Sequence, residues 1–432
     1  DAGSDIISML SFDFFGPAFG TADAEVAQEI MRNPGRFIKP TDIYEVLNLF
    51  GRNVVTINGE EYRIHKKITS PSFSESNNKL VHKETLAIID ALFETWEGRD
   101  RIDYHNVLDL TVALTLMVIS SAGFGVRIPW GEEECPPGHK LSFKVAIEGV
   151  SAGLMMKVAL PSFAMSWTKK TAHIDLCFKE LGRYMHGFVH ERSRNNDYQD
   201  LLSNLIAANE NDGEGLKLTE DEVVGNIFIF LIAGHETTAH SLAFCLGFLA
   251  LYPDIQQKVF EHIRERVADP YGSITYEELN SVPMVLAVLY ETLRIFPAVT
   301  SIPRVCVSET TLRSVKSNGE TIAVPIPAGG IVNVATAGVH FNPRYWKDPE
   351  EFRPERFLGD WPRNAFLPFA AGARACMGRR FAEVEAIIVL CKIVANYRID
   401  ILEEARFAGE TFEQRKARVL SCTDLITTTP ER

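Results

Sequence analysis

The sequence lacks an excess of positive charge. Its 432 residues include 44 Lys and Arg against 57 Asp and Glu, which gives a formal net charge of −13. Because proteins that bind nucleic acid neutralise phosphates with basic residues, this balance excludes nucleic acid as a general partner.

Cysteine is scarce and dispersed. The seven cysteines lie far apart, and no C-x-x-C pair occurs among them. An odd, scattered set argues against a disulfide framework and against a zinc site, and it fits a reducing compartment.

A secretory signal and a membrane anchor are also lacking near the start of the sequence. The uncharged apolar run Leu110 to Val126 is at the short limit for a membrane span, so we expect a buried core helix there. The sequence opens at Asp1 without an initiator methionine, and we therefore expect it to be a fragment or a processed form.

The patterning predicts a mainly α fold with a small β-rich part. Helical periodicity covers residues 60–69, 77–96 and 107–121, and the longest helix is expected from a capping box at Thr219 and Glu222 to Pro253. That helix is apolar nearly all round, which predicts that it is buried. β-rich pieces are expected at residues 6–15, 54–57 and 321–334.

A cysteine loop near the C-terminus carries the strongest chemical signal. Residues 369–378 read F-x-x-G-x-R-x-C-x-G, and a helix-compatible apolar segment follows at once. Glycines let amide N–H groups turn toward a sulfur, and a helix beginning after Cys376 favours a thiolate. We interpret Cys376 as an axial thiolate on heme iron, with Phe369, Gly372, Arg374 and Gly378 shaping its loop. The alternative is a small buried cysteine in a Gly/Ala loop.

A polar group interrupts the longest helix. Ala233, Gly234, Glu236 and Thr237 lie in an otherwise apolar run, where an acid and a hydroxyl are costly to bury. Small residues leave room for a ligand, and an acid beside a hydroxyl can relay protons. The alternative is a kinked core helix with internally satisfied polar groups. His235 and His240 are five apart, not the four of a helical zinc motif, so zinc is set aside.

Glu291 and Arg294 are three apart on a predicted helix and can form an ion pair. Arg356, in the later segment Pro354 to Phe357, can complete a buried Glu-Arg-Arg cluster that ties a long loop to this helix.

With these motifs in this order, the chain resembles a cytochrome P450, a heme-thiolate monooxygenase of the microsomal type found in fungi and animals. The resemblance rests on A-G-x-E-T-T at 233–238, E-x-x-R at 291–294, P-E-R-F at 354–357 and the cysteine loop. It implies a single cytochrome P450 domain over residues 1–432, without the family's N-terminal anchor and first elements, with a long central helix over heme b.

The resemblance also implies roles for particular residues. Cys376 would be the metal ligand, and Glu236 and Thr237 the catalytic pair that delivers protons to dioxygen. Glu291, Arg294 and Arg356 would be structural. The heme-binding set would comprise Tyr62, Lys66, Ala233, Arg304, Phe369, Gly372, Arg374 and Gly378. At Tyr62 and Lys66 the family usually has Trp and Arg, and lysine offers a point charge where arginine offers a planar fork.

The expected reaction inserts one atom of O2 into a lipophilic small molecule. Ala233, Val299, Thr300 and the segment 54–55 are the expected pocket walls. Since no flavin or nicotinamide motif is present, electrons would come from NADPH-cytochrome P450 reductase, with cytochrome b5 as a second donor. Four basic residues could dock an acidic reductase, and the alternative is that they form a solvated helix surface: Lys66, Lys67, Arg379 and Arg380. The parent protein would lie on the cytosolic face of the endoplasmic reticulum membrane.

Two other functions are compatible with a heme-thiolate loop. One is a peroxygenase or isomerase that performs no monooxygenation, and the other is a non-catalytic heme carrier or sensor. Neither needs an acid-alcohol pair, so Glu236 and Thr237 count against both.

Overall fold

The computed structural model describes residues 4–11, 16–131, 133–194, 200–210, 216–316, 318–424 and 427–431. The chain forms two compact units, the first of residues 1–40, 98–112 and 237–432 and the second of residues 41–97 and 113–236. One boundary falls inside helix α9 (Glu220–Leu251), between Glu236 and Thr237. The single-domain organisation over residues 1–432 stays a prediction.

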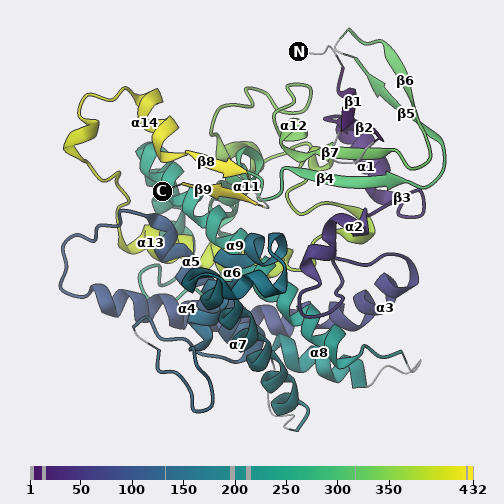
Figure 1. The fold of residues 1–432 in the computed structure, drawn as a ribbon. Coiled ribbons are helices and arrows are strands. Elements are labelled where there is room, and N and C mark those ends of the chain that lie inside the picture. Colours follow the sequence, from purple (N-terminus) through teal and green to yellow (C-terminus); the bar gives the residue numbers. More distant parts are fainter. Residues whose placement is uncertain are drawn as a thin grey trace. The chain divides into compact units, whose positions relative to one another are not determined.

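The first unit contains a five-stranded sheet built from distant parts of the chain. Figure 1 shows its strands side by side in the order β1-β2-β7-β4-β3. Their bounds are β1 (Ile6–Ser11), β2 (Gly16–Thr21), β7 (Ile331–Ala335), β4 (Ser301–Cys306) and β3 (Phe37–Ile38). β2 and β7 run parallel, while the other neighbouring strands are antiparallel.

Two small hairpins accompany this sheet in the described part of the first unit. One pairs β5 (Thr310–Val315) with β6 (Thr321–Ile326), and the other pairs β8 (Cys422–Asp424) with β9 (Thr428–Pro430). Apart from parts of α5 (Val107–Val118) and α9, the unit's helices are α1 (Ala24–Arg32), α10 (Pro253–Arg266), α11 (Pro283–Ile295), α12 (Thr336–His340), α13 (Arg379–Asn396) and α14 (Phe412–Val419).

The regular secondary structure in the described residues of the second unit is entirely helical. Its helices are α2 (Thr41–Tyr44), α3 (Gly59–Thr69), α4 (Glu75–Trp96), the second half of α5 (Val107–Val118), α6 (Phe143–Ala159), α7 (Lys169–Arg192), α8 (Leu201–Glu210) and the first half of α9. A π-helical segment, Ile119–Gly123, continues α5. The expected mainly α class with small sheets is therefore confirmed.

Helix α9 begins as its sequence predicts. The Thr219 hydroxyl accepts a hydrogen bond from the Glu222 amide at 3.3 Å, and the Glu222 carboxylate accepts one from the Thr219 amide at 2.8 Å. This is the reciprocal capping box expected at a helix start. Within the described ranges, α9 is the one helix long and apolar enough to cross a membrane, but 78% of its most apolar window is buried in protein. A core helix meets the same criterion.

The expected β-rich piece at residues 54–57 is wrong, because this described segment forms a turn. The Asn53 side chain accepts a hydrogen bond from the Val55 amide at 3.1 Å, and the Thr56 hydroxyl accepts one from the Asn53 amide at 3.2 Å. Such side-chain hydrogen bonds compete with strand pairing and favour turns. The β-branched composition of the segment was outweighed by Asn53 and Thr56.

Gly225 lets α9 approach the loop that precedes this turn. A Cβ at Gly225 would lie 2.5 Å from the Gly51 carbonyl oxygen and 2.7 Å from that of Arg52, so backbone would have to move. We expect Gly225→Ala to destabilise the protein by about 1–3 kcal/mol, the usual cost of overpacking. Thermal unfolding measures the effect.

Gly187 provides the matched control, since it also lies inside a helix but nothing lies within 4 Å of its added Cβ. Gly187→Ala is expected to raise the unfolding temperature, because alanine favours helices over glycine by up to about 1 kcal/mol. Equal stabilisation by both substitutions would contradict the close approach at Gly225.

Candidate functional site

The cysteine loop ends where α13 begins. The Cys376 amide donates to the Phe369 carbonyl at 2.9 Å, which closes the loop. Gly372 has φ +69°, and a Cβ there would collide with the Met31 carbonyl at the end of α1. Gly378 has φ −80° and is the N-cap of α13. Glycine is therefore required at position 372, because φ is positive there and a Cβ would not fit. Gly378 has an ordinary φ and acts as the N-cap of α13.

Two backbone amides donate hydrogen bonds to the Cys376 sulfur. The side chain is exposed, whereas Cys177, Cys245, Cys306 and Cys391 are buried. Desolvation by the surrounding protein raises the pKa of the Cys376 thiol, while amide hydrogen bonds from Gly378 and Arg379 and the charge of Arg379 oppose this rise.

Three cations lie together beside this loop in the first unit. Ile38 pairs with Val305 in the β3–β4 ladder, so Lys39 comes next to Arg304. Burial, followed by the charges of Arg374 and Arg304, lowers the pKa of Lys39 to about 7. Burial is the larger cause, and the two guanidinium groups add to it, so an anionic group would be favoured beside these side chains. No motif marks Lys39, so sequence reasoning missed it.

Helix α9 has an open window in its middle. Ala233 is exposed, and Gly234, Glu236 and Thr237 are half-buried, although residues 223–232 and 238–246 on either side are all buried. This part of an otherwise buried, apolar helix exposes a small residue, an acid and a hydroxyl. That exposure favours a ligand-binding surface over a kinked segment of the core.

Tyr62 and Lys66 share one face of α3 in the second unit. Both are half-buried, and the Lys66 ammonium lies 5.9 Å from the centre of the Tyr62 ring. The pair thus presents a hydroxyl and a positive charge close together.

Glu291, Arg294 and Arg356 form one buried cluster. Arg294 makes a two-pronged contact with the Glu291 carboxylate at 2.8 and 3.0 Å, and Arg356 donates to it at 2.9 Å. The Arg353 amide adds a donor at 2.8 Å. Other guanidinium N–H groups donate to backbone carbonyls, those of His340, Lys347, Asp348 and Glu351. The structure therefore ties the long loop to α11, as the motif spacing suggests.

His340 connects this cluster to the cysteine loop and was not anticipated. Its Nδ1–H donates to the Arg294 carbonyl at 3.0 Å, and its Nε2 accepts from the Leu367 amide at 2.8 Å. Burial lowers the pKa of His340 to about 3, so the ring stays neutral. Only a neutral imidazole has one donor nitrogen and one acceptor nitrogen, as these two hydrogen bonds require.

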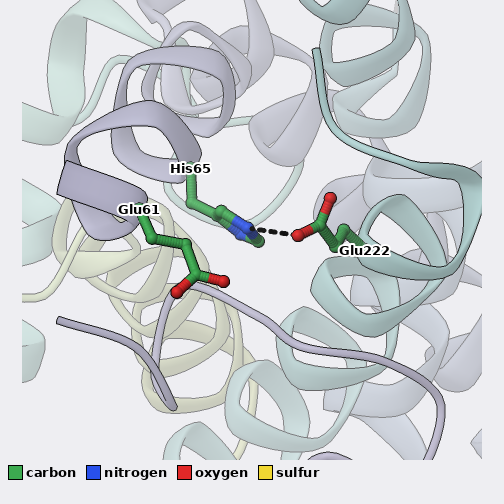
Figure 2. A group of neighbouring side chains, drawn as sticks. All are labelled: Glu61, His65 and Glu222. Atoms are coloured by element: carbon green, nitrogen blue, oxygen red, sulfur yellow. Dashed lines mark ion pairs between the residues drawn. The ribbon is translucent and has the colours of Figure 1, made fainter. Parts of the chain in front are cut away.

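A second unanticipated group lies in the second unit. Figure 2 shows His65 of α3 between Glu61 and Glu222, with its ring directed toward Glu222 of α9. The His65 Nε2 is 3.5 Å from the Glu222 carboxylate, and Glu61 pairs with Arg52 at 2.7 Å. Histidine with two carboxylates is a donor set that a divalent metal can use.

The hydrogen bonds around His65 argue against a metal there. The Asn226 amide nitrogen donates to the Glu222 carbonyl at 2.7 Å and faces the His65 Nδ1 at 3.1 Å, while its oxygen accepts from the Val54 amide. Nδ1 is therefore an acceptor, and the proton of the neutral ring sits on Nε2. A metal-bound histidine needs the opposite arrangement, with Nδ1–H donated to an acceptor. The group is a histidine–carboxylate tether between α3 and α9.

The residues of the cysteine loop fit a heme thiolate. They offer a sulfur with two amide donors at a helix N-terminus, and Arg304 and Arg374 offer positive charge for carboxylates. Iron would bind Cys376, and coordination by a metal deprotonates a thiol whose pKa burial has raised.

Comparisons with known proteins agree with these features. The family model described as cytochrome P450 matches residues 16–415. The chain is 46% identical to cytochrome P450 monooxygenase 124 of Postia placenta, across 100% of this chain and 85% of the relative. It is 30% identical to cytochrome P450 monooxygenase ORF6 of Penicillium roqueforti, across 88% of this chain and 73% of the relative. The heme domain of cytochrome P450DA has a similar fold, with a TM-score of 0.78, 22% identity and coverage of 99% of this chain and 88% of that one.

The neutral His340 predicts a specific acid sensitivity. Its pKa is about 3 in the folded protein and near 6.5 in the unfolded chain, so only the unfolded state takes up a proton between these values. Stability should fall as pH drops from about 6.5 toward 3, by at most about 1.4 kcal/mol per pH unit from this group. Unfolding by urea between pH 7 and 4 measures the slope.

His340→Gln keeps a donor and an acceptor but cannot titrate, so its stability should fall less steeply with acid than that of the unmodified protein. His105→Gln, at an exposed position, is the control and should keep the original slope. Identical slopes for all three proteins would rule out His340 as the source.

Proposed function

The chain belongs to the cytochrome P450 family and is an oxidoreductase of the monooxygenase type, and from this premise we propose that it binds heme b through Cys376. The main support is the cysteine loop, where an accessible sulfur lies at the N-terminus of α13 with two amide donors. When bound, heme supplies dioxygen activation and one-electron chemistry, and a thiolate ligand favours cleavage of the O–O bond.

The residues around the heme are proposed to bind and orient it. Arg304 and Arg374 would pair with propionates from the strand β4 and the cysteine loop, and Tyr62 and Lys66 would donate to them from α3. Guanidinium forks match carboxylates well, which suits this role. Phe369 would limit water near the sulfur, while Ala233 leaves space beside α9 for the macrocycle and substrate.

Glu236 and Thr237 are proposed to move protons. The Glu236 carboxyl would give a proton to the Thr237 hydroxyl oxygen, which would pass its own proton to the dioxygen being reduced. Both residues are half-buried at the open window of α9, so they can reach a ligand and solvent. This pair favours monooxygenation over peroxygenase, isomerase or carrier functions.

The substrate is proposed to be a lipophilic small molecule, because the expected walls, Ala233, Val299, Thr300 and residues 54–55, are small or apolar. Electrons would come from NADPH-cytochrome P450 reductase or cytochrome b5, at the cytosolic face of the endoplasmic reticulum membrane. Arg379 and Arg380 both pair with Glu383, at 2.8 and 3.7 Å, so part of their charge is already neutralised. Lys66 and Lys67 are the other proposed docking residues.

The heme ligand can be tested by spectroscopy. The reduced, carbon-monoxide-bound protein should show the red-shifted Soret band of thiolate ligation, and Cys376→Ser should abolish it. Cys422→Ser, a partly exposed cysteine elsewhere in the first unit, should leave the band in place. An unshifted band in the unmodified protein with heme bound would refute the proposal.

The proton relay can be tested by measuring how tightly NADPH consumption is coupled to substrate oxidation. Thr237→Ala should raise the hydrogen peroxide released per NADPH consumed by several-fold, because the relay loses its hydroxyl. The measurement uses a reductase and a compound found by its substrate-induced spin shift. Thr238→Ala removes the same group from the next, buried position and should couple normally. Equal peroxide release from Thr237→Ala and the unmodified protein would remove Thr237 from the relay.

A further inference from the structure

A hydrogen-bonded ring of three side chains lies beside the cysteine loop. The Tyr290 hydroxyl of α11 donates to Glu383 Oε1 at 2.6 Å, and Arg379 Nε donates to the same oxygen at 2.8 Å. Arg379 Nη2 donates in turn to the Tyr290 oxygen at 2.7 Å. Every contact has one donor and one acceptor, so the ring closes without conflict.

The protonation of the ring is well defined. Burial, and next the charge of Glu383, raises the pKa of Tyr290 to about 12. Tyr290 therefore keeps its proton at neutral pH and can donate to Glu383 while accepting from Arg379. The Tyr290 and Glu383 side chains are both buried, which restricts the positions that the arginine can take.

Arg379 is the member of the ring nearest in sequence to the sulfur. Its backbone amide donates to Cys376, and its guanidinium charge favours the Cys376 thiolate. The guanidinium also lies 5.3 Å from the Phe369 ring centre and 5.7 Å from that of Tyr290. It is thus positioned between the cysteine loop and α11, and its place depends on contacts with both.

A fixed positive charge near a ligating thiolate has a definite electronic effect. It attracts electron density on the sulfur, so the ligand donates less to the ferric ion. Because electron donation stabilises ferric over ferrous iron, the charge should make the reduction potential more positive. A carboxylate next to the guanidinium opposes this, and the net field depends on where both are held.

We propose that Arg379 is a positioning residue that sets the electrostatic field at the Cys376 sulfur, and that Tyr290 and Glu383 hold its guanidinium there. The triad thereby tunes the reduction potential of the heme, and so the ease of the first electron transfer. This inference rests on the proposed ligation of heme by Cys376.

The test is the midpoint potential of the heme-loaded protein, measured by spectroelectrochemistry without substrate. Arg379→Gln should shift the potential to a more negative value, and Arg379→Lys, which keeps the charge but not the fork, should recover part of it. Glu383→Gln keeps an acceptor oxygen for its partners and removes the opposing charge, so it should shift the potential in the positive direction. The double variant Arg379→Gln/Glu383→Gln should lie close to the unmodified protein.

Arg380→Gln is the matched control. Arg380 is the next residue of α13 and carries the same charge, but it reaches Glu383 only at 3.7 Å and bonds to Asn280 at 3.4 Å. Its substitution should shift the potential much less than Arg379→Gln. Tyr290→Phe should give a smaller negative shift than Arg379→Gln, because the charge remains but is held less firmly.

The outcomes separate this inference from the proposed function. If the unmodified protein lacks the thiolate Soret band, the ligation itself is wrong. If that band is present in every variant but Arg379→Gln matches the unmodified potential, the triad does not tune the heme. Shifts of the same sign in Arg379→Gln and Glu383→Gln would show a merely structural role. Should Arg379→Gln fail to bind heme, opposite shifts in Glu383→Gln and Tyr290→Phe still support the proposal, and shifts of one sign overturn it.

Discussion

One buried carboxylate, that of Glu291, holds together the part of the chain on which the candidate site depends. It accepts hydrogen bonds from two guanidinium groups and one backbone amide, with no exposure to solvent. Burying charges is expensive unless every member is paired, so the cluster is stable only when α11 and the loop after α12 are both in place. The cluster therefore selects one conformation for a loop that has little regular structure of its own.

From α11, two contacts extend this order to the cysteine loop. His340 accepts a hydrogen bond from the Leu367 amide just before the loop, and its neutral ring depends on complete burial. Tyr290, the residue before Glu291, reaches Glu383 and Arg379 just after the loop. Both ends of the loop thus contact groups anchored on one helix, which keeps the sulfur position and its electrostatic surroundings well defined.

Much of the fold and the motif-based site could be predicted because the sequence patterns that indicate them are local. The capping box of α9 and its polar interruption occupy a few consecutive positions, and the structure shows the box formed and the interruption open to solvent. Lys39, His340, Tyr290 and Glu383 could not be found this way. Each is a single residue whose partner is distant in sequence. The segment 54–57 was misread because two side-chain hydrogen bonds outweighed its β-branched composition.

The sequence by itself determined the class of cofactor and chemistry, since a thiolate loop, an acid-alcohol pair and a glutamate–arginine motif need only short, fixed spacings. The tertiary structure decided which charged groups lie next to one another and which titratable groups keep their protons. It brought Lys39 beside Arg304 and Arg374, fixed the tautomers of His65 and His340, and linked Arg379 to Tyr290 and Glu383. The physical reason is that desolvation and hydrogen-bond direction depend on burial and on neighbours far along the chain, which local spacing does not encode.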